Sequence, residues 1–187
     1  MSMKVLNNII SFSLLVITIG VFSSCSQYEL PEHSLDVEFK YELTCSEGLL
    51  KYVTPQVTIT DTKGVQQTIS IEDGMWKGTN RKTWTQSIHY DSVNVSNMMT
   101  VRYIPKSGIT YQDEVAFDNA HNLSCYIIVQ EDGDGIRNDY TIIPDFPSAV
   151  DVKADVLENY IERLSQSATT RGGKVDSKGE VTKIEND

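Results

Sequence analysis

The stretch LDVEFKYELTC, residues 35–45, decides the fold class of this 187-residue chain. Apolar residues alternate in it with charged residues and threonine, and Cys45 falls on the apolar side. A period of two predicts a β-strand with one buried face. The stretch LSCYIIV, residues 123–129, repeats the alternation with Cys125 on its apolar side. We therefore expect both cysteine side chains to point into one core.

Short β segments separated by turn residues fill the chain between and beyond these two stretches. DTKG, residues 61–64, joins two of them as a hairpin whose glycine adopts a positive φ. The pattern predicts a mainly β fold, an antiparallel β-sandwich over residues 35–147. The further segments are QVTIT (56–60), VQQTISI (65–71), TWTQSIHY (83–90), MMTVRYI (98–104), DEVAF (113–117) and DYTII (139–143).

Beyond Pro147 the period changes from that of a strand to that of a helix. Ser148 is expected to cap an amphipathic helix over residues 148–165, which should pack its apolar stripe on the sandwich. Docking of the stripe onto a partner protein is the alternative. The polar residues 166–187 bury too little apolar surface to become ordered, so they are predicted to form a flexible tail. The stripe consists of Val150, Ala154, Leu157, Ile161 and Leu164.

Residues 1–24 have the layout of a secretory signal peptide. Lys4 precedes an apolar run over residues 9–22. The run is shorter than the roughly 18 residues that indicate a membrane span. Its end, FSSC at residues 22–25, resembles the lipobox of small Bacteroidota-type bacterial lipoproteins.

The lipobox resemblance implies that the protein is exported and has a membrane partner. In that family the signal is cut before the cysteine, here Cys25, whose sulfur receives a diacylglycerol and whose amino group is acylated, as with palmitate. Residues 25–34 would then form a tether to the outer membrane, on its periplasmic or its surface face. The alternative is a cysteine that happens to follow a cleavable signal.

The two other cysteines of the chain, Cys45 and Cys125, form an even remainder in an exported protein. An even count in an oxidising compartment predicts a disulfide between them. Such a bridge would stabilise the fold by roughly 4–5 kcal/mol in the chain-entropy model. Two reduced, buried cysteines that act as small hydrophobic residues are the alternative.

Two inward-facing cysteines with tryptophans between them in the sequence resemble the core of an immunoglobulin-type sandwich. The likeness covers residues 35–143. Leu123 stands two positions before Cys125, where an antibody-type domain carries its corner tyrosine. The resemblance therefore implies immunoglobulin-like architecture and not membership of that family.

Composition and motifs exclude several function classes. The net charge of −10 argues against nucleic-acid binding, which needs a basic face. The sequence has no nucleophile elbow, phosphate-binding glycine loop, CxxC pair or HExxH motif. We therefore assign no catalytic residue and expect a protein that is not an enzyme and needs no cofactor.

The stretch EDGDGIRND, residues 131–139, is the one candidate for ion binding. Its hard oxygen donors and glycines resemble the aspartate-glycine loops of thrombospondin type 3 repeats, which implies weak Ca²⁺ binding. The alternative is a plain hairpin connection, for which Asp-Gly is already a strong signal. The candidate ligands are Asp132, Asp134, Asn138 and Asp139.

Ser92 lies in DSV, residues 91–93. This triplet matches the O-glycosylation acceptor pattern of Bacteroidota-type exported proteins. The resemblance implies a glycan on Ser92, and an ordinary turn serine is the alternative.

These features predict an outer-membrane or cell-surface lipoprotein that acts as a non-catalytic binding or structural module. One alternative is a carbohydrate-binding or hydrolase accessory protein of the envelope, with a glycan partner stacked on Trp76 and Trp84. Another is a subunit or regulator of a surface assembly, with an envelope protein docked on the helix stripe. Buried tryptophans favour a plain scaffold, and exposed coplanar ones favour glycan binding.

Overall fold

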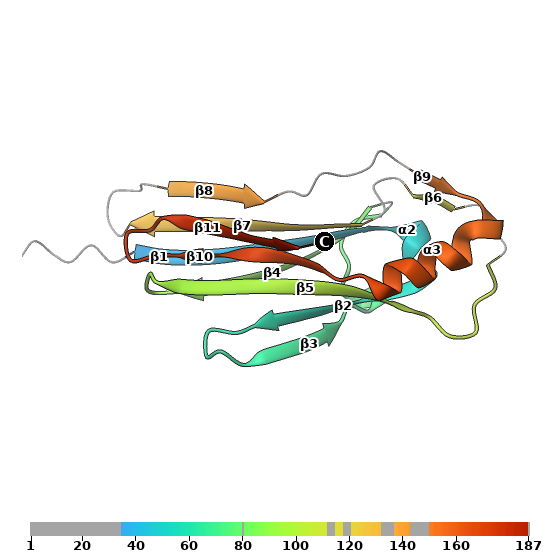
Figure 1. The fold of residues 1–187 in the computed structure, drawn as a ribbon, viewed down its shortest axis with the longest axis horizontal. Helices are drawn as coiled ribbons and strands as arrows, with labels where there is room; N and C mark the ends of the chain where they lie inside the picture. The colour runs from blue at the N-terminus through green and yellow to red at the C-terminus, as the bar shows by residue number, and fades with distance from the viewer. Residues whose placement is uncertain are drawn as a thin grey trace, which may run out of the picture. The chain divides into compact units, whose positions relative to one another are not determined.

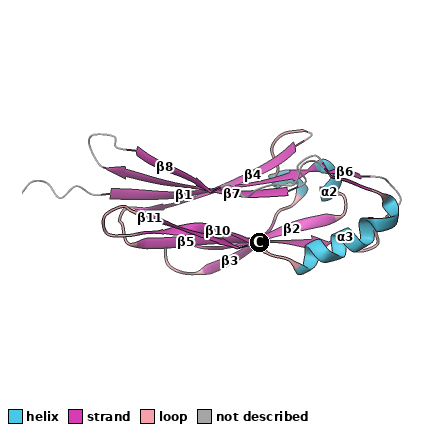
Figure 2. Cartoon of the chain, turned by 45° about the horizontal axis from the view of Figure 1, so that its top comes forward, coloured by secondary structure: helices cyan, strands magenta, loops and turns pink. Residues whose placement is uncertain are grey.

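The computed structural model describes residues 35–79, 81–111, 115–117, 121–131, 137–142 and 150–186. All described residues belong to one compact unit, residues 34–187. In this unit two antiparallel sheets pack face to face over one hydrophobic core, as Figure 2 shows. The predicted β-sandwich is confirmed.

The first sheet is built around β1, which has β4 on one side and β7 on the other. Alternate residues of β1 from Val37 to Cys45 are each at most 1% exposed, as their period of two predicts. Burying one large apolar side chain contributes about 1.5–3 kcal/mol, so this strand anchors the core. In spatial order the strands are β4 (Arg81–Tyr90), β1 (Leu35–Ser46), β7 (His121–Glu131) and β8 (Arg137–Ile142).

The second sheet combines strands from the middle of the chain with strands from its last residues. The predicted hairpin at DTKG joins β2 to β3, and Gly64 has a φ of 79°. In spatial order the strands are β11 (Val181–Asn186), β10 (Thr169–Val175), β5 (Val95–Pro105), β2 (Val53–Thr60) and β3 (Gln66–Ser70).

The smaller elements α2, α3, β6 and β9 gather at one end of the sandwich, as Figure 1 shows. Strands β6 and β9 pair with each other, and α3 contacts β5 and β9. The elements are α2 (Glu47–Leu50), the 3₁₀ turn η1 (Asp73–Met75), β6 (Val115–Phe117), β9 (Val150–Val152) and α3 (Ala154–Gln166).

The prediction of a flexible tail at residues 166–187 is wrong, because β10 and β11 form a hairpin within the second sheet. Val175 is fully buried, and the Arg171 side chain is only 1% exposed. A Cβ atom at Gly172 would lie 2.2 Å from the Asn97 carbonyl oxygen. Gly172 therefore allows close packing of β10 on β5, and the sandwich extends to residue 186 instead of 147.

The predicted helix at residues 148–165 begins later than expected. It spans α3 (Ala154–Gln166), Lys153 occupies its N-cap without a side-chain hydrogen bond, and the expected cap Ser148 lies outside the described residues. Val150 belongs to β9, so the extended backbone there delays the start of the helix. The expected packing on the sandwich is confirmed. Three stripe residues join the core: Leu157, Ile161 and Leu164.

The predicted disulfide is wrong, and both cysteines are free thiols buried in the core. Although β1 and β7 are neighbours, Cys45 lies opposite His121, and Cys125 lies opposite Tyr41. Four residues of register separate the two sulfurs by roughly 13 Å along the strands. A disulfide needs Cα atoms about 4.4–6.8 Å apart, so these cysteines cannot be bridged.

The strand order also differs from that of an immunoglobulin domain. There, the two cysteine strands lie in opposite sheets and their disulfide joins the sheets. Here both cysteine strands, β1 and β7, belong to the first sheet. The likeness is one of sandwich architecture.

A buried polar cluster connects the two sheets. The Tyr41 hydroxyl on β1 donates to Asn97 Oδ1 on β5 at 2.8 Å. The side-chain Nδ2 of Asn97 donates to the Thr60 carbonyl at 2.6 Å and to the Tyr90 hydroxyl at 2.9 Å. Because buried polar groups are costly unless they are paired, this cluster favours one relative position of the sheets.

We expect Cys45 and Cys125 to resist thiol reagents in the folded protein and to react once it unfolds. Burial raises the pKa of both thiols, that of Cys125 to about 12, so the reactive thiolate is scarce in the native state near pH 8. Labelling of the non-reduced protein in denaturant should modify both residues, as peptide mass spectrometry would show. If both cysteines remain unlabelled and are linked to each other, the disulfide prediction is correct after all.

Gly172→Ala should lower the free energy of unfolding by about 1–3 kcal/mol, the usual range for an overpacked site. The added methyl group would clash with the backbone of β5. The matched control is Gly74→Ala, where nothing lies within 4 Å of the new atom. Urea unfolding of both variants gives the comparison, and equal stabilities would contradict the close approach of β10 and β5.

Candidate functional site

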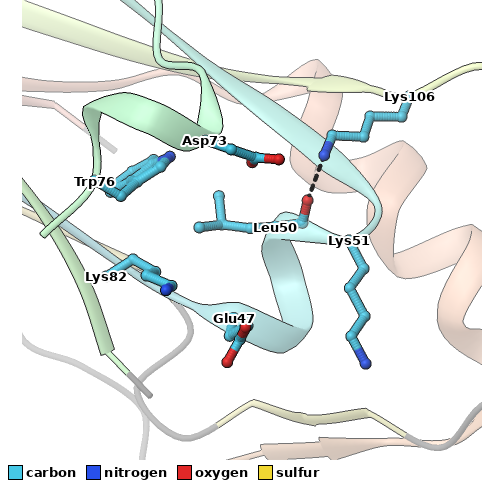
Figure 3. A pocket seen from close by; sticks show the side chains of 7 residues that line it. All are labelled: Glu47, Leu50, Lys51, Asp73, Trp76, Lys82 and Lys106. Carbon is cyan, nitrogen blue, oxygen red and sulfur yellow. Dashed lines mark hydrogen bonds between the residues drawn. The ribbon is translucent and has the colours of Figure 1, made fainter. Parts of the chain in front are cut away.

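A pocket of about 360 Å³ lies between α2, η1, the start of β4 and the residue after β5 (Figure 3). We call it the α2 pocket. Its size is at the lower end of the range for small-molecule sites, about 300–1,000 Å³. Its lining residues are Glu47, Leu50, Lys51, Asp73, Trp76, Lys82 and Lys106.

The short helix α2 forms the corner where the chain leaves the first sheet for the second. Ser46 ends β1 and caps α2, because its hydroxyl accepts a hydrogen bond from the Leu49 amide at 3.1 Å. Leu49 and Leu50 are buried, which fixes the helix on the core. Glu47, in the first turn, is thereby held at the pocket.

Two of the three pocket lysines are fixed by backbone carbonyl groups. Lys106 Nζ donates to the Leu50 carbonyl at 2.7 Å, the bond drawn in Figure 3, and Lys82 Nζ donates to the Gly78 carbonyl at 3.2 Å. An ammonium group has three N–H donors, so each retains donors for a ligand. Among the described residues, no carboxylate forms an ion pair with these lysines or with Lys51.

Trp76 is half-buried against the core and also lines the α2 pocket. Its indole Nε1 is buried and has no hydrogen-bond partner among the described residues. Figure 3 shows this nitrogen on the side of the ring toward Asp73. An unpaired buried donor costs about 1–3 kcal/mol, which an acceptor would offset.

The stacking platform of Trp76 and Trp84, which belongs to the carbohydrate-binding alternative, does not form. Trp84 is only 7% exposed and belongs to the hydrophobic core, opposite Leu43 of β1. Alternation along β4 turns this residue inward, so Trp76 is the tryptophan that remains for a ligand.

Several predicted site residues are not brought to this pocket. Cys25, Asp132 and Asp134 lie outside the described residues, while Asn138 and Asp139 belong to β8. The structure therefore leaves the calcium prediction untested. Ser92 is exposed in the connection between β4 and β5, which is compatible with modification.

A smaller pocket of about 170 Å³ lies on the first sheet beside His89 and Glu38, whose Nε2 and Oε1 atoms are 3.8 Å apart. Asp36 and Asp91 also line it. Across the described ranges, no group of three or more His, Cys, Asp or Glu side chains is placed to hold a metal ion. We therefore take the α2 pocket as the candidate site.

Sequence reasoning singled out Trp76 and missed the lysines. Lys51 follows α2, Lys106 follows β5 and Lys82 is the second residue of β4, and no motif connects the three. What distinguishes these three lysines is their charge, because they gather in one pocket of a chain whose net charge is −10.

Within the described ranges, no helix has the length and apolar character needed to cross a membrane. Models of known protein families, curated protein sequences and solved structures were each compared with this chain, and none of them matches it.

Proposed function

We propose that this protein is an exported lipoprotein whose β-sandwich acts as a non-catalytic binding module at the outer membrane. The observation that carries the proposal is FSSC at residues 22–25, after a charged start and a short apolar run. Each buried methylene group of an acyl chain contributes about 0.8 kcal/mol, so two or three chains on Cys25 would anchor the protein stably.

The start of the sandwich agrees with a short tether. Strand β1 begins at Leu35, so residues 25–34 separate the proposed lipid from the folded domain. A fully extended residue spans at most about 3.6 Å, which limits this tether to roughly 36 Å. A ligand bound by the domain would thus be held close to the membrane.

The α2 pocket supports binding as the activity of the domain. Two of its ammonium groups, those of Lys82 and Lys106, are fixed by carbonyl oxygens, so charged donors are held in place at the pocket. In contrast, the proposed docking of α3 onto a surface assembly loses its basis, because the apolar stripe of the helix is buried in its own sandwich.

We expect Cys25→Ala to move the protein from the membrane fraction to the soluble fraction of the exporting cell. The reason is that the variant lacks the sulfur that receives the diacylglycerol. Detergent phase partitioning measures the change, and Ser26→Ala is the control that alters the neighbouring residue and keeps the thiol. Identical partitioning of wild type and Cys25→Ala would end the lipoprotein proposal.

A further inference from the structure

The local charge of the α2 pocket is opposite to that of the chain. Three lysines and two carboxylates line it, whereas the whole chain has a net charge of −10. Figure 3 shows Lys82 and Lys106 on opposite sides of Leu50, and the Lys51 side chain points away from the other labelled side chains. Because the ammonium groups of Lys82 and Lys106 are tied to backbone carbonyls, they are available to an anion without first breaking an ion pair.

The carboxylates and the indole add two further requirements for a ligand. Glu47 and Asp73 accept hydrogen bonds, so they favour a ligand that carries hydroxyl donors. Trp76 adds an apolar ring to the same lining. A compact ring with hydroxyl groups, an apolar face and one negative charge meets all three conditions.

We propose that the α2 pocket binds a carboxylated sugar ring. The carboxylate is attracted by Lys82 and Lys106, the ring hydroxyl groups donate to Glu47 and Asp73, and the ring lies against Trp76. A neutral sugar lacks the charge for the lysines, and a simple carboxylate lacks the hydroxyl groups and the ring. The inference rests on the proposed binding function of the domain and is independent of the lipid anchor.

The first test is calorimetric titration of the full chain with D-glucuronate, D-glucose and acetate. We expect a dissociation constant on the order of 1 mM for glucuronate, and binding about tenfold weaker or absent for the other two. Glucuronate binding should also weaken as salt is added, because charge attraction contributes to it. Equal affinities for glucuronate and glucose, or no glucuronate binding at tens of millimolar, would overturn the proposal.

The second test uses lysine variants. Lys82→Met and Lys106→Met should each weaken glucuronate binding by about tenfold, the effect of losing one charge-assisted contact. The control Lys183→Met makes the same charge change on an exposed residue of β11, outside the pocket, and should bind like wild type. Equal affinity of Lys82→Met and Lys183→Met would also overturn the proposal.

Thermal melts establish that each variant is folded. If Lys106→Met fails to fold because it loses the bond to the Leu50 carbonyl, Lys82→Met alone decides the outcome. Cys25 is unchanged in these experiments, so a failure of sugar binding would leave the membrane-anchor prediction standing. A failure of membrane anchoring would likewise leave the sugar-site proposal standing.

Discussion

The approach of β10 to its neighbours is the constraint on which the rest of the sandwich depends. A Cβ atom at Gly172 would lie 2.2 Å from the Asn97 carbonyl oxygen, and one at Gly173 would lie 2.4 Å from Ile127 Cδ1. The first contact sets the spacing of β10 and β5, and the second sets the spacing of the two sheets, because Ile127 belongs to β7. At this spacing the Tyr41 hydroxyl reaches Asn97 across the core. Gly172 and Gly173 and the polar cluster of Tyr41 and Asn97 therefore favour the same spacing of the two sheets.

Local patterns in the sequence predict much of this fold, and one local pattern was overlooked. The alternation around Cys45 and the turn DTKG correctly predict β1 and the hairpin of β2 and β3. The second hairpin uses a turn of the same kind, DSKG at residues 176–179. Asp61 and Asp176 each accept two backbone N–H bonds at 2.8–2.9 Å, and the glycine of each turn has a positive φ. The polar composition of the last residues concealed this repeat.

The disulfide and the pocket show what local patterns cannot supply. Alternation correctly places Cys45 and Cys125 inside the core, but it carries no information about the register of β1 and β7, on which the distance between the sulfurs depends. The pocket is likewise a product of the chain path. Lys82 and Lys106 meet Leu50 only because α2 turns the chain from one sheet to the other. Trp76, which the sequence singles out by residue type, is the member of the site that could be anticipated.

The position of β10 has a consequence for the timing of folding. Strand β5 gains its second neighbour only after residues 169–175 have been synthesised, and β11 then pairs with β10. Pairings between segments so distant in sequence form slowly, since the chain entropy of closing the loop is lost before the contacts form. A chain that emerges from the ribosome thus remains without a complete second sheet until its last strands appear.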